Sequence, residues 1–325
     1  MTNERGRRTV GVVGAGVIGR VHLGVLRSFP QVEVVALVNP VRPAEELVGP
    51  AAWFPTLGAA LSTGAAPDLL VLATPTETHL GLAAEALAAA PGTTVLSEKP
   101  LTGDPGLLAA FRRDHAAHLD RLRVVNHFAY SPEVRWALAT VEEHGWGPPQ
   151  VVLADFSDPS VLFPPERRAS YVSGWIDSGA NQLSMLADFV GEMSVVVQHA
   201  DPEGMRAVTE VRFPGGRASL VTNWCTGSSS KRTTLRWSGG HELLLDHTAM
   251  TGLLLQDGEI RAHLGNDGTV DRKTAHYAGL YRALLADPGD PRLSLDRAAT
   301  VAALLAAGSG AAPSNGGVRW STAAF

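Results

Sequence analysis

The stretch TVGVVGAGVIGRVH, Thr9 to His22, begins as a β-branched run, turns through glycines and continues with apolar residues at helical spacing. Its central part, GAGVIG, fits the pattern G-x-G-x-x-G between a predicted strand and a predicted helix, the context that gives this pattern meaning. Glycines there permit a tight turn and a close approach of the backbone to a pyrophosphate at the helix N-terminus. The stretch therefore predicts a dinucleotide site, with a plain strand–turn–helix of another α/β fold as the alternative. The predicted contact residues are Gly14, Gly16, Val17, Ile18 and Gly19.

Strand-like and helix-like segments alternate around this stretch, which is the pattern of a parallel sheet covered by helices on both faces. The predicted strands are residues 9–14, 32–39, 68–74, 93–98 and 121–126, and the predicted helices are residues 17–28, 82–90 and 107–119. Residues 1–126 are therefore predicted to form a doubly wound, Rossmann-type dinucleotide-binding domain.

Beyond residue 126, strand follows strand with short turns, which predicts a mixed, mostly antiparallel sheet. The predicted strands are residues 151–156, 194–200, 205–213, 217–224, 233–239, 241–247 and 252–260, and the helices are residues 132–144, 274–285 and 294–307. Residues 127–325 are thus expected to bind substrate, and the C-terminal helix could pack back on the first domain. One face of the sheet is expected to be open, so a homodimer or homotetramer would cover its apolar side chains.

Composition limits the classes of function. The 325 residues suffice for two domains, and 45% hydrophobic with 18% charged residues indicates a folded protein. A formal net charge of −5 without a basic run makes nucleic acid an unexpected partner. No apolar run reaches the roughly 18–20 residues of a membrane span, and the N-terminus lacks the apolar stretch of a secretory signal. We therefore expect a cytoplasmic protein without membrane association.

No metal site is predicted. Cys225 is the single cysteine, which excludes an internal disulfide and a cysteine-based metal cluster. His115 and His118, flanked by Asp114 and Asp120, could suggest a metal site, but no third ligand follows at a recognisable spacing. We expect a solvated helix face there.

The end of the second predicted strand bears on the choice between NAD and NADP. NAD-binding domains place an acidic residue there, about 20 residues after the glycine motif, to bind the ribose hydroxyls. This chain has Asn39 at that position, so no carboxylate repels a 2′-phosphate, and Arg42 is near enough to pair with one. NADP is the preferred prediction and NAD the alternative. The other interpretation of Arg42 is a solvated loop arginine.

Three ordered segments resemble one family. GAGVIGRVH (residues 14–22), ATPTETH (residues 73–79) and SEKPL (residues 97–101) together are similar to the glucose–fructose oxidoreductase / inositol dehydrogenase (Gfo/Idh/MocA) family. The resemblance spans the whole chain and implies an NAD(P)-dependent oxidoreductase. It also implies that Thr74, Pro75, His79 and Glu98 border the cofactor, although His79 could simply begin a helix.

The family resemblance implies a role for Lys99, because the lysine of the EKP segment lies beside the nicotinamide in that family. The physical argument agrees, since the carboxyl end of a strand in a doubly wound sheet opens onto the ligand crevice. A lysine beside a positively charged oxidised nicotinamide is expected to have a depressed pKa and could exchange a proton with substrate or bond the reacting oxygen. The alternative is a turn lysine that pairs with Glu98 or solvent.

A second set of candidates lies in WIDSGANQLSML, residues 175–186. Family members usually carry D-x-G-x-H-x-x-D, and this chain keeps Asp177 and Gly179 but has Asn181 for the histidine and Ser184 for the last aspartate. An amide does not titrate near neutral pH, so proton transfer would fall to Asp177 or Lys99, with Asn181 orienting the substrate. A D-x-G-x-N pattern also resembles the family's aldose 1-dehydrogenase branch. The alternative is that Asp177 only caps a helix.

Weaker candidates complete the predicted site. His127 could bind a sugar hydroxyl or be an ordinary boundary histidine, and Trp175 could stack on a sugar ring or be a packed core residue. The loop that carries Arg167, Arg168 and Tyr171 is expected to help select the substrate.

The sequence predicts an enzyme that transfers a hydride between NAD(P) and a sugar or polyol carbon. In this prediction, Lys99 and Asp177 converge on the reacting carbon and handle the proton. The alternatives are a nucleotide-sugar ketoreductase of secondary metabolism and a catalytically silent sensor of dinucleotide or sugar.

Overall fold

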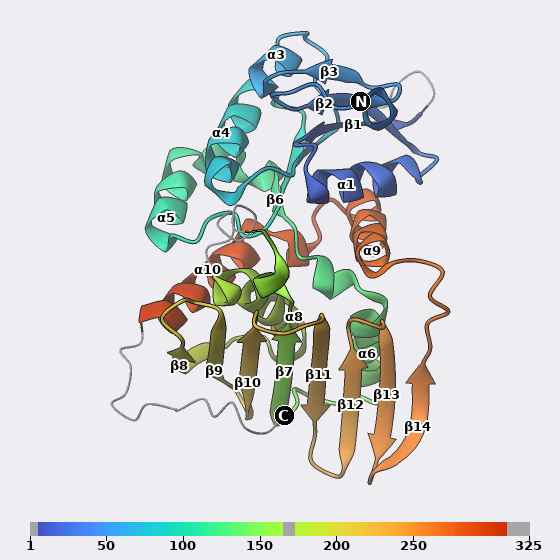
Figure 1. Ribbon diagram of the computed structural model, residues 1–325, viewed down its shortest axis with the longest axis vertical. Coiled ribbons are helices and arrows are strands. Elements are labelled where there is room, and N and C mark those ends of the chain that lie inside the picture. Colours follow the sequence, from blue (N-terminus) through green and yellow to red (C-terminus); the bar gives the residue numbers. More distant parts are fainter. Residues whose placement is uncertain (1–5, 165–172, 311–325) are drawn as a thin grey trace. The chain divides into compact units, whose positions relative to one another are not determined.

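The computed structural model describes residues 6–164 and 173–310, and the chain forms two compact units (Figure 1). Unit 1 comprises Met1–Trp136 and Asn266–Ala302, and unit 2 comprises Ala137–Gly265 and Ala303–Phe325. Two helices, α6 (Pro132–Glu143) and α10 (Leu295–Gly310), contribute residues to both units.

Unit 1 contains a six-stranded parallel sheet in the order β3-β2-β1-β4-β5-β6, which confirms the predicted Rossmann-type fold. Its strands are β1 (Arg8–Val13), β2 (Val32–Val38), β3 (Ala52–Phe54), β4 (Leu69–Leu72), β5 (Thr94–Ser97) and β6 (Leu122–Val124). The order reverses between β1 and β4, and ligands of such sheets bind beyond the carboxyl ends of the strands at this point.

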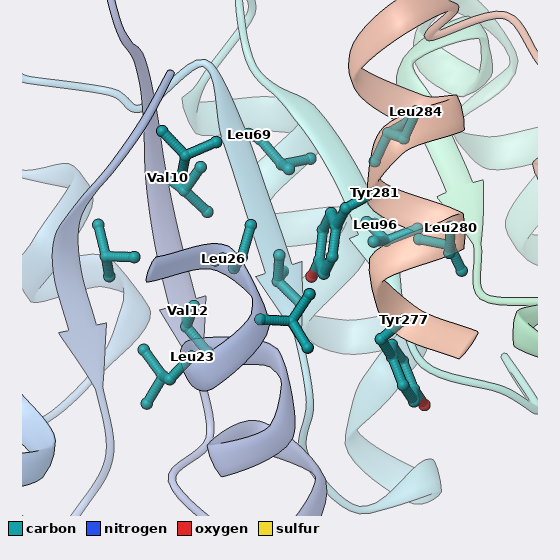
Figure 2. Packing of buried hydrophobic residues seen from close by; sticks show 14 of the residues in the cluster. Val10, Val12, Leu23, Leu26, Leu69, Leu96, Tyr277, Leu280, Tyr281 and Leu284 are labelled. Carbon is teal, nitrogen blue, oxygen red and sulfur yellow. The ribbon is translucent and has the colours of Figure 1, made fainter. Parts of the chain in front are cut away.

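Two hydrophobic cores lie on the two faces of this sheet. Neighbouring residues of β4 alternate between them, with Leu69 and Val71 in one core and Leu70 and Leu72 in the other. The first core includes residues of α1 (Val17–Arg27) and α9 (Arg272–Ala286), and Figure 2 shows the side chains of both helices there. The second core includes residues of α3 (Leu57–Leu61), α4 (His79–Ala89), α5 (Pro105–Asp114) and α10.

The predicted elements of unit 1 are found with shifted ends. Asp104 accepts backbone hydrogen bonds at the start of α5, so this helix begins at Pro105 rather than at residue 107. Strand β3 and the short helices α2 (Glu45–Val48) and α3 were not predicted, because segments of three to five residues carry almost no periodicity.

Unit 2 contains an eight-stranded sheet in the order β14-β13-β12-β11-β7-β10-β9-β8. Only β7 and β10 run parallel to each other among the described pairs, so the predicted mixed, mostly antiparallel sheet is confirmed. The strands are β7 (Val151–Ser157), β8 (Ser194–Ala200), β9 (Arg206–Phe213), β10 (Gly216–Asn223), β11 (Ser230–Arg236), β12 (His241–Asp246), β13 (Thr251–Gln256) and β14 (Glu259–Leu264). The main helix of unit 2 is α8 (Ala180–Val190).

One predicted strand of unit 2 was wrong. Residues 252–260 form a hairpin of β13 and β14 rather than one strand, because Asp257 and Gly258 both have positive φ angles, 54° and 82°. An Asp-Gly pair is a strong signal for such a two-residue turn. Among the helices of the described part of the chain, none has the length and apolar content needed to cross a membrane.

Candidate functional site

The glycine turn after β1 fits a bound dinucleotide. Gly14 has a φ of 100°, and a Cβ there would lie 2.4 Å from the Ala73 carbonyl oxygen; a Cβ on Gly19 would lie 2.0 Å from the carbonyl oxygen of Gly14. These two glycines are therefore required by packing. Gly16 differs, because a Cβ there would have nothing within 4 Å. Open space over this backbone is what the approach of a pyrophosphate requires.

The N-terminus of α1 adds an anion-binding feature. Gly16 is the N-cap residue and supplies no side-chain hydrogen bond to the first turn. The first backbone N–H groups of a helix, together with the helix dipole, favour a bound anion. Gly14, Gly16, Val17, Ile18 and Gly19 thus lie together around a place suited to phosphate.

Asn39 follows β2 and holds the glycine turn. Its Oδ1 accepts a hydrogen bond from the Ala15 N–H at 3.1 Å, and its Nδ2 donates to the Val41 carbonyl oxygen at 2.6 Å. Arg42 is exposed and pairs with Glu45 at 3.0 Å. A 2′-phosphate at Arg42 would therefore compete with a carboxylate of this chain.

Thr74 and Pro75 follow β4, and His79 begins α4. The His79 ring is buried, with Nδ1 lying 2.9 Å from the Pro100 carbonyl oxygen and Nε2 lying 2.8 Å from the Thr74 carbonyl oxygen. His79 thereby links the turn after β4 to the turn that follows β5. A neutral imidazole has one N–H and can donate to one of these carbonyls at a time.

Glu98 and Lys99 follow β5, and Glu98 is the centre of a buried polar network. Its Oε1 lies 2.9 Å from Nε2 of His22 on α1 and 2.6 Å from the hydroxyl of Tyr277 on α9. The Tyr281 hydroxyl lies 2.6 Å from Nδ1 of His22. The remaining carboxylate oxygen, Oε2, accepts the backbone N–H of Lys99 at 3.1 Å. The turn that carries Lys99 is thus tied to two helices through one carboxylate.

The network keeps Glu98 ionised. Burial raises the pKa of its carboxyl, but the hydrogen bond and charge of His22, the Tyr277 hydroxyl and the charge of Lys99 lower it further, so the pKa lies below its ordinary value. Burial, followed by the nearby Glu98 carboxylate, raises the pKa of Tyr281 well above its ordinary value, so this hydroxyl keeps its proton.

His127 lies in the short 3-10 helix His127–Tyr130 and stacks on the Tyr277 ring. Its Nδ1 lies 3.2 Å from Nδ1 of His276. Burial, then the charges of His276, Lys99, Arg272 and Lys273, lowers the pKa of His127 well below its ordinary value. His127 is therefore an uncharged imidazole near neutral pH.

In unit 2, a single π-helical turn, Trp175–Gly179, runs directly into α8. Asp177 is the one residue between positions 174 and 186 that is not buried. Asn181 lies one turn further, and its Nδ2 donates to the Asp177 carbonyl oxygen at 3.3 Å. π-Helical turns inside α-helices often occur at functional sites.

The capping interpretation of Asp177 is wrong. No side chain caps α8, and Asp177 lies within the helical run rather than before it. The hydroxyl of Ser173 instead accepts the Ile176 N–H at 3.2 Å, because Ser173 is the residue that precedes this run.

Trp175 is a packed residue of unit 2, so its predicted stacking on a sugar ring is corrected. It is 3% exposed, and its Nε1 donates to the Leu305 carbonyl oxygen at 3.0 Å. A Cβ on Gly179 would lie 2.4 Å from its ring. The indole therefore explains why glycine follows Asp-Ser in this motif.

A second polar network lies beside Asp177. The carboxylate of Asp158, directly after β7, binds the ammonium of Lys231 on β11 and accepts the Ser229 hydroxyl at 3.0 Å. The Ser178 hydroxyl lies 3.5 Å from the same carboxylate and accepts the Trp224 indole N–H at 3.2 Å. The helical turn of Asp177 is thus attached to the sheet of unit 2.

The sequence did not single out Tyr277, Tyr281, His276, Asp158 or Lys231. Tyr277 and Tyr281 lie four residues apart and so share one face of a predicted helix, but nothing in the sequence indicates that His22 and Glu98 meet that face. The described residues do not bring three potential ligands of a metal ion together. Arg167, Arg168 and Tyr171 lie outside the described residues.

Comparison with known proteins supports the resemblance. Residues 8–119 match the model of the oxidoreductase family with an NAD-binding Rossmann fold, GFO_IDH_MocA. No curated protein matches the chain significantly in sequence.

Solved structures share the fold over almost the whole chain. GenD2 from gentamicin A biosynthesis, in complex with NAD, has a TM-score of 0.76 at 22% identity, covering 93% of each chain. A myo-inositol dehydrogenase from Corynebacterium glutamicum ATCC 13032 has a TM-score of 0.76 at 17% identity, covering 93% of this chain and 97% of its own. KijD10, a 3-ketoreductase from Actinomadura kijaniata in complex with TDP-benzene and NADP, has a TM-score of 0.74 at 19% identity, covering 94% and 97%.

The parallel six-stranded sheet and the glycine turn define a Rossmann-type unit, and the family model that matches it describes oxidoreductases with an NAD-binding Rossmann fold. Residues 8–119 are thus similar to the NAD-binding part of the Gfo/Idh/MocA family, the family that the motifs resemble.

Proposed function

We propose that the protein transfers a hydride between a nicotinamide dinucleotide and a hydroxyl- or keto-bearing carbon of a sugar or polyol. The observation that carries this proposal is the turn after β5, where Glu98 fixes the backbone of Lys99. This turn follows β5 at the carboxyl edge of the same sheet that carries the glycine turn after β1, as expected for a ligand crevice.

The residues of the glycine turn and the first turn of α1 would hold the dinucleotide. The bound nicotinamide would supply the hydride acceptor or donor. Asn39 places no carboxylate where a 2′-phosphate would lie, and Arg42 offers a charge for it, which supports NADP over NAD. Thr74, Pro75 and His79, on the neighbouring turn, would border the same ligand.

Lys99 and Asp177 would handle the proton. In the oxidative direction, a neutral Lys99 amine or the Asp177 carboxylate would accept the proton of the substrate hydroxyl. Asn181 would hydrogen-bond a substrate hydroxyl, because an amide both donates and accepts. The part-exposed position of Asp177 in an otherwise buried helical run supports its contact with a ligand.

Turnover with candidate substrates tests the proposal. The protein would be incubated with NADP or NAD and a panel of aldoses and polyols while the absorbance of reduced cofactor is followed. Lys99→Met and Asp177→Asn should each lower kcat by about 10²–10⁴-fold while dinucleotide affinity stays within a few-fold. Lys273→Met is the matched control and should retain turnover. Full activity in both site variants would rule the assignment out.

Gly16→Ala provides the complementary test of the cofactor site. It adds a methyl group where the protein itself places nothing, so folding should be nearly unaffected while dinucleotide affinity falls at least about tenfold, the loss of roughly 1.4 kcal/mol. An unchanged dinucleotide affinity, measured by calorimetry, would mean that the cofactor does not bind over Gly16.

A second candidate is reduction of a keto group on a nucleotide-linked sugar. It is favoured by the fold similarity to KijD10, whose structure contains TDP-benzene and NADP, and to a UDP-N-acetylglucosamine 3-dehydrogenase. Oxidation of NADPH by keto sugars linked to TDP or UDP, without activity on free aldoses, would select it. Dinucleotide binding without turnover on any substrate would instead indicate a sensor, consistent with Asn181 in place of histidine.

We also propose that a second copy of the chain covers the outer face of the eight-stranded sheet. Leu153 on the central strand β7 is 43% exposed, and ion pairs such as Arg232–Asp246 surround it with both signs of charge. Such a face can pair with itself. Light scattering should give a multiple of 34.2 kDa, and Leu153→Asp should give the monomer; a monomeric wild-type protein would contradict the proposal.

A further inference from the structure

The residue directly before Lys99 in unit 1, Glu98, has a buried carboxylate. Its side chain is 7% exposed, and its donors come from α1 and α9, helices whose sequence positions are separated by more than 200 residues. We propose that Glu98 is a positioning residue that fixes the turn bearing Lys99 and supplies the counter-charge of the Lys99 ammonium. This inference rests on the proposed function, since it affects turnover only if Lys99 exchanges the proton.

Hydrogen-bond accounting assigns the donors and acceptors of the network. The Tyr281 hydroxyl keeps its proton and can donate it to Nδ1 of His22, which leaves the N–H of His22 on Nε2, facing Glu98. The Tyr277 hydroxyl donates to the same carboxylate. With this tautomer the Glu98 carboxylate accepts from both His22 and Tyr277, and each of these donors has a partner.

The carboxylate acts on both the backbone and the charge of Lys99. Oε2 accepts the Lys99 N–H at 3.1 Å, and the Glu98 N–H donates to the Leu72 carbonyl oxygen of β4 at 2.9 Å. Hydrogen bonds from two successive backbone N–H groups therefore hold the chain at Lys99, directly after β5. Lys99 lowers the pKa of Glu98, and by reciprocity the charge of Glu98 stabilises the protonated form of Lys99.

The other groups around this turn do not supply the same charge. Lys99, Arg272 and Lys273 all act on His127, whose pKa they lower together with His276, so this side carries excess positive charge. Glu133 lies 3.8 Å from Nε2 of His276. Glu98 is the carboxylate bonded directly to the Lys99 peptide.

The lysine content of the chain makes the counter-charge measurable without activity. The sequence has three lysines, Lys99, Lys231 and Lys273. Reductive methylation with ¹³C-formaldehyde labels accessible amines, and NMR titration of the dinucleotide-free full-length protein follows each one. Lys99→Arg assigns the Lys99 signal.

Glu98→Gln keeps the shape of the side chain and removes its charge. The titration of Lys99 should then move down by about one pH unit or more, whereas that of Lys273 should stay in place. Glu98→Asp keeps the charge and should keep the Lys99 titration near that of the wild type. A Lys99 titration that is the same in wild type and Glu98→Gln overturns the proposal.

Kinetics separate this inference from the proposed function. In Glu98→Gln, the limb of the pH–rate profile that depends on Lys99 should shift in the same direction as the NMR titration of Lys99. A lower kcat without a shift of this limb would mean that Glu98 has only a structural role. Turnover that survives in Lys99→Met refutes the proposed function but leaves the NMR test intact. If Glu98→Gln does not fold, the NMR titration of the wild-type protein still tests the proposal. A Lys99 that titrates about two pH units below Lys273 would contradict the proposal that Glu98 stabilises the protonated form of Lys99.

Discussion

Glu98 in unit 1 and Asp158 in unit 2 are both carboxylates held beside a candidate catalytic residue, but their charges are balanced in different ways. Glu98 receives hydrogen bonds from the side chains of His22 and Tyr277, and Lys99 is the adjoining cation. Asp158 has a dedicated counter-ion, the ammonium of Lys231. The carboxylate of Glu98 is therefore held by neighbouring hydrogen-bond donors and adjoins Lys99 in the chain, whereas that of Asp158 binds an ammonium from another strand.

The two turns are also fixed by different kinds of contact. Polar side chains hold the turn of Lys99, so the loss of one partner leaves a buried group unsatisfied. The turn of Asp177 is held largely by the packing of Trp175 against Gly179 and by the hydroxyl of Ser178. We expect substitutions near Lys99 to change its titration, and substitutions near Asp177 to change stability.

The largest effect is expected from breaking the Asp158–Lys231 pair. The side chain of Lys231 is 6% exposed, so Asp158→Asn removes the carboxylate that binds a buried ammonium and should lower the free energy of unfolding by about 3–5 kcal/mol. Lys231→Met should cost less, because Asp158 is 22% exposed and keeps the hydroxyl donor of Ser229. Urea denaturation measures both values.

Asp296→Asn is the control for this comparison. It breaks an exposed pair with Arg112, in which the Asp296 side chain is 82% exposed, and should cost no more than about 1 kcal/mol. Equal costs for Asp158→Asn and Asp296→Asn would contradict the view that Lys231 is a buried counter-ion.

Packing behind Asp177 should give the next largest effect. Gly179→Ala would place a methyl group 2.4 Å from the Trp175 ring and should destabilise the protein by about 1–3 kcal/mol. The Gly179→Ala/Trp175→Leu double variant should recover part of this cost, since the smaller side chain makes room. Additive losses in this double-mutant cycle would mean that the indole does not set the requirement for glycine.

In unit 1, the lowered pKa of His127 predicts a pH dependence of stability. Its pKa is well below the ordinary value of about 6.5 because it is buried near His276, Lys99, Arg272 and Lys273. The unfolded chain therefore binds a proton at higher pH than the folded chain does, and stability should fall as pH decreases below about 6.5, by up to about 1.4 kcal/mol per pH unit. His127→Gln should lack this contribution, so the stability difference between wild type and variant in urea titrations should change with pH below about 6.5; a parallel pH dependence of the two proteins would refute the assignment.

The same contrast explains what could be predicted from the sequence. The glycine turn was predictable because its glycines meet local requirements of backbone conformation and close packing. The position of Lys99 at the carboxyl edge of the sheet was predictable because this residue follows the end of a predicted strand. The network of Glu98 was not, because Tyr277 and Tyr281 lie 179 and 183 residues beyond it and only tertiary packing brings α9 to α1. Asp177 was identified through its motif, whereas the capping alternative for Asp177 and the sugar-stacking interpretation of Trp175 were wrong. Both concern the orientation of a side chain within a helical run, which periodicity does not determine.

The smallest predicted effect concerns the proposed 2′-phosphate position of the cofactor site, where the charge of Arg42 is paired with a nearby carboxylate. Arg42 pairs with Glu45 at 3.0 Å, and the two side chains are 58% and 71% exposed. An exposed pair is weak, so a 2′-phosphate that needs Arg42 displaces Glu45 at a modest cost. Glu45→Gln should therefore lower KM for NADP by about two- to fivefold, and KM for NAD should not change. Glu46→Gln, which alters the neighbouring carboxylate without touching this pair, is the matched control and should leave the ratio of the two KM values unchanged. Equal changes in KM for NADP and NAD in Glu45→Gln would mean that Arg42 does not recognise the 2′-phosphate.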